Sequence, residues 1–512
     1  MLTLDQLIAR NARKFTDSAA VIDHDPRCGR QQHSWQQLNE QSNQLADFLK
    51  QRYTLKKGDR VGLFLPNGYA FVLAYFAIQK LGGIAVPINV KLTAPELSYI
   101  LNNSGAKVLL TGQLTEAAVI KLIGEPSGGE AAGDDYQALW LDNYTELLEP
   151  YAITPPNHLD DQLAPCTLLY TSGTTGRPKG VLFNHQRLLA VATMMAVEME
   201  MKPSSRLLEL MPFTHSAPLN LFLLAGTLVG ASHVVAPTFT PDLLLDLAEQ
   251  ERTTHFFGAP VAYLLTAQQP DIAKRDLTSM SHWVYGGAPL SSAQVQAVRK
   301  AFNTNALYCV YGLTEAGPTG TLLMPEEHDT KAGSIGKRAA LHTEIRLVND
   351  KGEDPGVDTP GEIEIGGDGC MVEYWQNPSA TDDTRTADGW LKTGDIAVRD
   401  ADGFYWIVDR KKDIIISGGV NIYPREVETV LLQHPKVADT AVIGVPNEQW
   451  GESVKAFVVL KEPLTGAPDE LTKQLRDFLA EQLADYKLPR QFEMIEELPR
   501  NANGKVLKHE LS

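Results

Sequence analysis

The chain has 512 residues, 43% of them hydrophobic and 21% charged, a composition typical of folded proteins that excludes collagen-like, coiled-coil and wholly disordered chains. At about 100–200 residues per domain, this length predicts two to four structural units and a core that needs no disulfides. Lys and Arg total 46 and Asp and Glu total 63, giving a net charge of −17. This balance excludes a basic surface over the whole chain, so no nucleic acid is expected as a partner.

The cysteines and the apolar segments indicate a cytoplasmic protein. The four cysteines are Cys28, Cys166, Cys309 and Cys370, and none forms a CxxC pair, so neither a zinc site nor a redox motif is predicted. The first residues lack the apolar core of a signal peptide. The most apolar stretch, 219–236, contains polar residues and glycines, which favours a buried helix and strand over a transmembrane segment.

Helices and strands alternate in the first part of the chain, which predicts a largely parallel α/β sheet. In chain order, the hydrophobic spacing predicts a helix around 38–49, a strand over 61–65, a buried helix over 71–81 and a strand over 107–110. Residues 112–160 are rich in Gly, Pro and acidic residues, which predicts an irregular surface excursion between subdomains.

The pattern changes near residue 330, where residues 343–348 and 361–365 alternate as in antiparallel strands. A small β unit is therefore predicted over about 330–409. The chain then restarts as a compact α+β unit, with a helix beginning at Pro424, strands over 441–445 and 456–460, and an amphipathic helix over 471–483. The predicted fold class is α/β, with a large N-terminal domain over 1–409 and a smaller α+β C-terminal domain over 413–512.

A glycine- and hydroxyl-rich segment, Tyr170-Thr-Ser-Gly-Thr-Thr-Gly-Arg-Pro-Lys-Gly180, follows an apolar run. Glycines let backbone N–H groups approach an anion, hydroxyls add hydrogen bonds, and Lys179 adds positive charge, so the segment predicts a phosphate cradle. It is not the P-loop of nucleotide triphosphatases, because Arg177 follows Gly176 where that motif has Lys. Taken alone, a run of this composition would be typical of a surface turn.

The whole string resembles the signature of the adenylate-forming superfamily, which includes acyl-CoA synthetases, aryl-CoA ligases, peptide-synthetase adenylation domains and beetle luciferase. Other segments resemble further motifs of this superfamily and occur in the expected order along nearly the whole chain. They are Tyr285-Gly-Gly-Ala-Pro-Leu290, Tyr311-Gly-Leu-Thr-Glu-Ala-Gly317, Lys392-Thr-Gly-Asp395 with Val408-Asp-Arg410, and Pro499-Arg-Asn-Ala-Asn-Gly-Lys505. One short motif would carry little weight, whereas the ordered set is specific.

The resemblance implies a reaction in two half-steps with Mg²⁺, ATP and coenzyme A. A carboxylate attacks the α-phosphorus of ATP, which gives an acyl-adenylate and pyrophosphate; a thiol then attacks the acyl carbon and expels AMP. Positioning and charge neutralisation suffice for this chemistry. That requirement agrees with the absence of an evident Cys or Ser nucleophile in the sequence.

The resemblance also implies which residues bind the nucleotide and the metal. Those for the β- and γ-phosphates are Thr171, Ser172, Gly173, Thr174, Thr175, Gly176 and Lys179. Those around the adenine and the ribose are Gly287, Ala288, Pro289, Tyr311, Gly312, Asp395 and Arg410. Thr314 is expected to face the α-phosphate, and Glu315 is expected to help bind Mg²⁺, a cation that prefers oxygen ligands.

Two residues, Lys505 and His215, are expected to act on the acyl group. By resemblance, Lys505 bridges the attacking carboxylate and the α-phosphate. A lysine near a chain end is ordinarily solvated, and only the surrounding motif favours the catalytic role. His215 resembles the gate between the acyl pocket and the thiol tunnel, although a lone histidine is more often structural.

The C-terminal domain is expected to be mobile, because it swings between the half-reactions in the superfamily. Lys412 matches the hinge, predicted over 410–412. The segment Ser417, Gly418 and Gly419 would line the CoA tunnel in the second pose. Beetle luciferases and plant coumarate ligases tend to carry a functional lysine where Ile416 stands, which disfavours both subfamilies.

Several members of the superfamily remain as alternatives. A CoA ligase is favoured by His215 and by residues 417–424. An amino-acid adenylating enzyme is disfavoured, because residues 211–230 contain no acid that could hold an α-amino group. A loader of acyl groups onto a carrier protein and a luciferase-like oxygenase are further alternatives. A non-catalytic nucleotide sensor is disfavoured, because such a protein would be expected to have lost Lys505, Glu315 or the phosphate loop, and all are present.

The predicted pocket segments limit the acid. They are 215–226, 255–260, 283–287 and 312–320, which are apolar and rich in small residues. No Arg or Lys occurs between Arg206 and Arg252, which disfavours a second carboxylate on the substrate. Residues 331–336 and 414–419 resemble those of bacterial fatty-acyl-CoA synthetases, and this resemblance implies medium- or long-chain fatty acids first and aromatic acids such as benzoates or cinnamates second. The sequence leaves open whether the chain forms a homodimer and whether a carrier protein accepts the acyl group.

Overall fold

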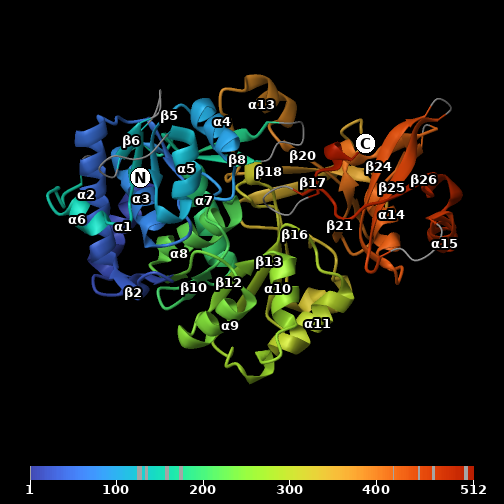
Figure 1. Ribbon diagram of the computed structural model, residues 1–512, viewed down its shortest axis with the longest axis horizontal. Helices are drawn as coiled ribbons and strands as arrows, with labels where there is room; N and C mark the ends of the chain where they lie inside the picture. Colours follow the sequence, from blue (N-terminus) through green and yellow to red (C-terminus); the bar gives the residue numbers. More distant parts are fainter. Residues whose placement is uncertain are drawn as a thin grey trace. The chain divides into compact units, whose positions relative to one another are not determined.

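The computed structural model describes residues 2–123, 130–132, 137–155, 161–171, 177–418, 420–447, 450–463, 468–500 and 506–511. The chain divides into two compact units (Figure 1). The first unit comprises Met1–Ile345 and Ile365–Leu391, and the second comprises Arg346–Glu364 and Lys392–Ser512. The second unit thus includes part of the predicted β unit, and the domain boundary near residue 410 stays a prediction.

The first unit contains a nine-stranded sheet whose central strands are mutually parallel. In spatial order its strands are β16 (Arg338–Ala339), β15 (Thr321–Leu323), β14 (Leu307–Tyr311), β13 (His282–Gly286), β12 (His255–Gly258), β10 (Arg206–Glu209), β11 (Ser232–Val235), β1 (Ala19–Asp25) and β2 (Gly29–Ser34). Only β2, β15 and β16, at the two sides, run antiparallel to their neighbours. Helices connect the parallel strands, as expected for α/β units.

An eight-stranded sheet, also in the first unit, is parallel over β8, β4, β3, β5 and β7. Its strands are β19 (Glu373–Tyr374), β9 (Lys179–Asn184), β8 (Pro165–Thr171), β4 (Ile84–Pro87), β3 (Arg60–Leu63), β5 (Ala106–Thr111), β7 (Gln137–Trp140) and β6 (Glu130–Ala132). The predicted irregular excursion over 112–160 is partly wrong, because β7 pairs with β5 there. The glycine- and acid-rich surroundings concealed this four-residue strand.

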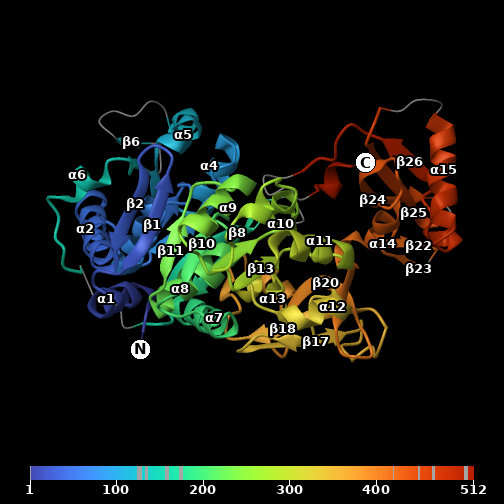
Figure 2. The same ribbon diagram turned by 90° about the horizontal axis from the view of Figure 1, so that it is seen from below.

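The helices of the first unit pack against these sheets; in Figure 2, α2 lies beside β1 and β2. They are α1 (Leu4–Lys14), α2 (Trp35–Tyr53), α3 (Tyr69–Leu81), α4 (Ala94–Ser104), α5 (Glu116–Ile123), α6 (Tyr144–Leu148), α7 (His185–Glu198), α8 (Leu224–Val229), α9 (Pro241–Gln250), α10 (Pro260–Ala267), α11 (Ser292–Phe302), α12 (His328–Lys331) and α13 (Pro378–Thr384). Nearly every residue of α3 is buried, as its continuous apolar run predicts.

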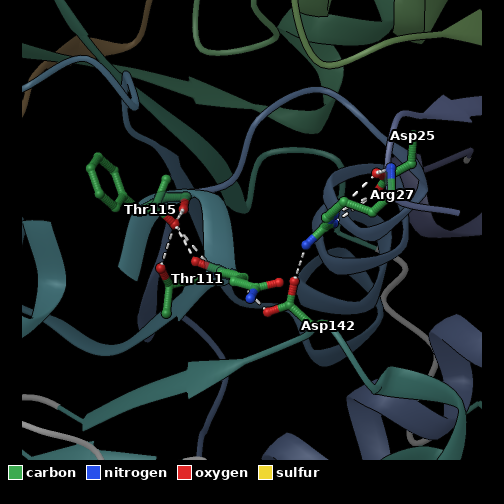
Figure 3. A network of polar contacts seen from close by, with 8 residues as sticks. Asp25, Arg27, Thr111, Thr115 and Asp142 are labelled. Carbon is green, nitrogen blue, oxygen red and sulfur yellow. Dashed lines mark hydrogen bonds and ion pairs between the residues drawn. The ribbon is translucent and has the colours of Figure 1, made fainter. Parts of the chain in front are cut away.

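An ion-pair network joins the turn after β1 to the second sheet (Figure 3). The Arg27 guanidinium donates to Asp25 Oδ2 at 2.6 Å and to Asp142 Oδ1 at 2.5 Å. Asp142, just after β7, also accepts the N–H of Gln113 at 2.7 Å. Nearby, Thr115 shares a hydrogen bond with Thr111. These polar bonds fix the loops at the ends of β5 and β7.

The remaining sheets confirm the predicted change of pattern. A four-stranded sheet has the order β17 (Thr343–Val348), β18 (Gly361–Gly367), β20 (Leu391–Arg399) and β21 (Tyr405–Arg410). The second unit also has a five-stranded sheet of β23 (Val420–Ile422), β22 (Ile415–Ser417), β25 (Gly451–Leu460), β24 (Val437–Asn447) and β26 (Gln491–Met494). Its helices α14 (Pro424–Leu431) and α15 (Pro468–Ala480) bury Val427, Leu475 and their apolar neighbours against this sheet.

The apolar stretch 219–236 is buried, as predicted, in a π-helical segment (Ala217–Leu223), α8 and β11. Throughout the described ranges, no helix is both long and apolar enough to cross a membrane.

Several histidines lie in the core of the first unit and are held in the neutral form. Burial, with His255 and Lys202 nearby, lowers the pKa of His282 to about 3. Burial likewise lowers the pKa of His185 and of His328 to about 4. The His282 ring stacks on that of His255 with centroids 4.4 Å apart. Below about pH 6.5 the unfolded chain binds protons that these folded side chains resist, so the folded state loses stability as the pH falls.

We expect His282→Phe to reduce this loss of stability, because phenylalanine keeps an aromatic ring for stacking but cannot bind a proton. One such histidine contributes about 1.4 kcal/mol per pH unit below 6.5, or about 2 kcal/mol at pH 5. Urea unfolding between pH 5 and 8 measures the effect. The free energies of unfolding of variant and parent should converge toward acid pH from a constant offset above pH 7; a pH-independent offset would contradict the assignment.

Candidate active site

The edge at which the parallel strands of the nine-stranded sheet end carries the predicted adenine residues and the segment that begins at Tyr311. β12, β13 and β14 are in register, with Gly258 opposite Tyr285 and Gly286 opposite Val310. The loops that follow these strands therefore begin side by side, where parallel α/β sheets ordinarily bind ligands. A Cβ atom on Gly286 would lie 2.8 Å from the Val310 oxygen, whereas one on Gly287 would meet nothing within 4 Å.

The predicted adenine segment is accessible, since Gly287 and Ala288 are exposed and Pro289 is half-buried. Gly287 adopts φ +85°, which glycine tolerates without strain. On the neighbouring strand, Tyr311 is half-buried at the end of β14. A Cβ atom on Gly312 would come within 2.3 Å of the Pro318 oxygen, so only glycine lets the loop fold back after Tyr311.

The turn Thr314–Ala316 brings the predicted α-phosphate and metal residues next to the predicted gate segment. The hydroxyls of Thr314 and Ser216 lie 3.0 Å apart and share a hydrogen bond. The Asn220 amide donates to the Gly317 oxygen at 3.3 Å. His215, half-buried, precedes Ser216 and accepts the N–H of Leu219 at its carbonyl. These hydrogen bonds hold the segment that begins at His215 against the turn that carries Thr314 and Glu315.

Asn67 holds the loop that leads to His215, a role that the sequence did not predict. Its amide donates to the oxygens of Glu209 at 3.3 Å and Met211 at 2.8 Å, and its Oδ1 accepts the N–H of Phe213 at 2.8 Å. Asn67 is 6% exposed and follows β3 of the other sheet. Pro66-Asn67-Gly68 predicts only a turn, so the sequence gives no sign of this clamp.

The predicted phosphate loop connects β8 to β9. Thr171 and Lys179 face each other across this hairpin, and the Thr171 hydroxyl donates to the Lys179 oxygen at 3.4 Å. Of the seven residues between them, Ser172, Gly173, Thr174, Thr175 and Gly176 lie outside the described residues. Both ends of the predicted loop are therefore fixed by strand pairing.

Tyr374 on β19 contacts both the lysine of the phosphate hairpin and the predicted metal ligand. The Lys179 Nζ atom lies 5.0 Å from the centre of the Tyr374 ring. The Tyr374 hydroxyl donates to Glu315 Oε1 at 2.7 Å. Burial and the nearby Glu315 carboxylate raise the pKa of Tyr374, so the hydroxyl remains a neutral donor. The sequence did not predict Tyr374 as a site residue.

The donor set around Glu315 fits Mg²⁺. Within the part of the chain that the structure describes, no group of three or more His, Cys, Asp and Glu side chains could hold a metal alone. Mg²⁺ usually binds through one or two carboxylates, substrate phosphates and water. One half-buried carboxylate beside the hairpin that carries Lys179 is consistent with a metal that arrives with a triphosphate.

The second unit contains the predicted ribose pair, and the two residues contact each other. Arg410 Nε lies 2.8 Å from Asp395 Oδ1, and Asp395 is 5% exposed. Arg410 also donates to the Thr393 oxygen at 3.2 Å. β20 and β21 place Asp395 opposite Arg410 in register. The guanidinium thus orients a buried carboxylate, whose oxygens can accept hydrogen bonds from hydroxyl groups.

The predicted hinge and tunnel segments follow in the same unit. Lys412 is exposed, 3.5 Å from the Asp413 carboxylate. Ser417 pairs with Gly451, and the Gly418 N–H donates to the Trp450 oxygen at 2.8 Å. Gly418 has φ +59°, and a Cβ atom there would lie 2.8 Å from the Trp450 ring. Gly419 and Lys505 lie outside the described residues.

The chain is similar to known proteins over most of its length. The family model described as AMP-binding enzyme matches residues 8–375, and that of the AMP-binding enzyme C-terminal domain matches residues 426–505. The long-chain-fatty-acid–CoA ligase FadD13 of Mycobacterium tuberculosis is 36% identical over 481 residues, 93% of this chain and 92% of that protein. The feruloyl-CoA synthase of an Amycolatopsis species is 38% identical over 463 residues, 89% of each chain.

A solved structure shares the fold over nearly the whole chain. The o-succinylbenzoate coenzyme A synthetase of Bacillus subtilis, in complex with ATP and a magnesium ion, superposes with a TM-score of 0.83 at 29% identity, covering 99% of this chain and 98% of that one. The predicted fold class and the resemblance to adenylate-forming enzymes are therefore confirmed. The roles of the individual residues stay predictions.

We expect Asn67→Ala to destabilise the loop before His215, because the substitution removes three hydrogen bonds and leaves buried backbone groups unpaired. At about 1–3 kcal/mol for an unpaired buried group, the free energy of unfolding should fall by about 2–4 kcal/mol. Urea unfolding measures it. Asn102→Ala, at an exposed position on α4, is the control and should stay within about 0.5 kcal/mol of the parent. An equal effect of both substitutions would contradict the clamp.

Proposed function

Because this chain belongs to the AMP-binding enzyme family and is an AMP-forming acid–thiol ligase, we propose that it joins a medium- or long-chain fatty acid to coenzyme A. ATP and Mg²⁺ serve the first half-reaction, which forms an acyl-adenylate and pyrophosphate. Coenzyme A then accepts the acyl group and AMP leaves. The overall type of reaction follows from the family and its ligase relatives, whereas the acid and the residue roles are the proposal.

The observation that carries the proposal is the contact between Ser216 and Thr314, whose hydroxyls lie 3.0 Å apart. The bond that forms in the first half-reaction joins the carboxylate to the α-phosphorus. An enzyme must therefore bring its acyl segment and its nucleotide segment together. Here the segment with His215 and Ser216 meets the motif with Thr314 and Glu315 directly.

Different residues of the site would neutralise different charges of the reaction. Thr171 and Lys179, at the ends of the phosphate hairpin, would bind the β- and γ-phosphates, and Thr314 the α-phosphate. Mg²⁺ held by Glu315 and the phosphates would offset negative charge as pyrophosphate leaves. In the second unit, the Asp395 carboxylate, fixed by Arg410, would accept hydrogen bonds from the ribose hydroxyls.

The two half-reactions need different groups beside the acyl carbon. Lys505 would stand between the carboxylate and the α-phosphate in the first, because a cation relieves the repulsion of two anions. Rotation at Lys412 would then replace Lys505 by the segment Ser417–Gly419. That segment has small side chains, which leave room for the narrow pantetheine arm of coenzyme A.

The predicted acyl-pocket segment over 215–226 is largely apolar. Leu219, Leu221 and Phe222 of the π-helical segment are buried, and the Phe222 ring lies 5.6 Å from that of Phe257. Such apolar side chains suit an aliphatic chain; an aromatic acid is the second candidate, since aromatic rings also pack against a planar substrate. In the described residues, Thr214 Oγ1 and Asn220 Oδ1 are buried without a hydrogen-bond partner, so polar atoms remain beside His215 for a substrate group.

A product assay tests the proposed function. The protein, ATP, Mg²⁺, coenzyme A and pooled aliphatic, aromatic and amino acids are incubated together, and the products are identified by mass spectrometry. We expect acyl-CoA from medium- or long-chain fatty acids, with neighbouring chain lengths also accepted, because one methylene contributes only about 1–3 kcal/mol to discrimination. Acyl-adenylate without thioester would indicate a carrier protein as the acceptor. If thioesters formed from aromatic acids alone, the fatty-acid substrate would be wrong and an aromatic acid would take its place.

The half-reactions can be separated at Lys505. We expect Lys505→Ala to lower adenylate formation by at least 100-fold, because the cation between the two anions is lost, yet to spare thioester formation from supplied acyl-adenylate and coenzyme A. Pyrophosphate release measures the first half-reaction, and acyl-CoA the second. Lys508→Ala, which loses an ion pair with Glu428, is the matched control and should retain both. Equal loss of both half-reactions in Lys505→Ala would contradict the exchange of faces.

A further inference from the structure

We propose that Tyr374 is a positioning residue that sets the Glu315 carboxylate for Mg²⁺ and the Lys179 ammonium group for the triphosphate. The inference rests on the proposed function, in which Glu315 binds the metal. Tyr374 lies on β19, whose residues pair with Val181 and Leu182 of β9. The same strand β9 begins at Lys179. One aromatic side chain thereby contacts both the phosphate hairpin and the metal-binding turn.

The position of Tyr374 is fixed by its own surroundings. Its side chain is 7% exposed, and its backbone N–H donates to the Thr381 hydroxyl at 2.9 Å. The Arg385 guanidinium donates to the oxygens of Met371 at 2.7 Å and Val372 at 2.9 Å. The segment that carries Tyr374 is thus anchored on α13 and on the residue after it.

This segment also holds the backbone of the metal-binding turn. The Met371 N–H donates to the Glu315 oxygen at 2.7 Å. A Cβ atom on Gly317 would lie 2.6 Å from the Gly369 oxygen, so the two segments approach as closely as glycine permits. Glu315 is therefore bound at its backbone by Met371 and at its carboxylate by Tyr374.

The bond to Glu315 leaves the carboxylate able to bind a cation. Two ionised oxygens offer about four acceptor positions, and the Tyr374 hydroxyl, at 2.7 Å from Oε1, uses one of them. A ligand oriented by an outer hydrogen bond loses about 10–100-fold in metal affinity when that bond is removed. The contact with Lys179 does not depend on the hydroxyl, because the face of the aromatic ring itself attracts the ammonium group.

These two contacts can be separated by substitution. Tyr374→Phe removes the hydroxyl and keeps the ring, whereas Tyr374→Leu removes both. The probe is the α,β-methylene analogue of ATP, which binds without transferring its nucleotide. Calorimetry gives its affinity in Mg²⁺ and in a chelator, and the ratio of the two is the gain due to the metal.

We expect Tyr374→Phe to reduce this gain about tenfold and to leave the metal-free affinity within twofold of the parent. Tyr374→Leu should also weaken the metal-free affinity several-fold. Glu315→Gln should lose the gain, and adding Tyr374→Phe to it should change nothing further, since coupled residues are not additive. Tyr69→Phe removes another buried hydroxyl, which donates to Gln41 at 2.5 Å, and should bind as the parent does.

The outcomes distinguish the two levels of inference. If Glu315→Gln loses the gain while Tyr374→Phe keeps it, the positioning role of Tyr374 is wrong and the proposed metal ligand stands. If Glu315→Gln keeps the gain, Glu315 does not bind the metal and both are overturned. Urea unfolding of Tyr374→Phe and Tyr69→Phe shows whether both variants fold as the parent does. If Tyr69→Phe also lost the gain in affinity due to the metal, the effect of Tyr374→Phe would reflect lost stability, and the positioning role would be wrong.

Discussion

Parallel pairing of β10, β12, β13 and β14 is the constraint on which the site of the first unit depends. Strands that run in the same direction and in register end at one edge of the sheet, so the loops that follow them emerge together. Gly286 and Val310 lie opposite each other, and the loops after them carry the adenine segment and the motif with Thr314 and Glu315. Residues distant in sequence thus become neighbours without dedicated contacts.

The second sheet supplies clamps to loops that the first sheet only brings near. Asn67, which follows β3, binds the backbone of the loop before His215 through three hydrogen bonds. Tyr374, on β19, binds Glu315 and packs under Lys179. Loops at a sheet edge have few backbone partners of their own, so side chains from a neighbouring element restrict their conformations. Positioning of this kind is what adenylate chemistry requires, since no protein nucleophile takes part.

Charge is local in this acidic chain. The net charge of −17 repels anionic substrates at long range, so ATP, coenzyme A and a carboxylate depend on individual cations. Lys179 lies over an aromatic ring, and Arg410 is paired with Asp395. In the second unit the Arg410 cation orders the Asp395 carboxylate, whereas in the first unit the Tyr374 phenol orders the Glu315 carboxylate.

The sequence by itself determined the reaction class and the α/β fold, and it predicted which residues bind the nucleotide. Short-range chemistry determines these features: Gly312 is required by its close approach to the nearby Pro318, and the alternation of strand and helix patterns reflects burial along one segment. The tertiary structure decided that Asn67 binds the loop before His215, that Ser216 forms a hydrogen bond with Thr314, and that Tyr374 contacts both Lys179 and Glu315. Each of these contacts links residues dozens to more than a hundred positions apart. Ser216 and Thr314 follow strands of one sheet, whereas Asn67 reaches from the other sheet, so only the tertiary arrangement of distant strands brings such residues together.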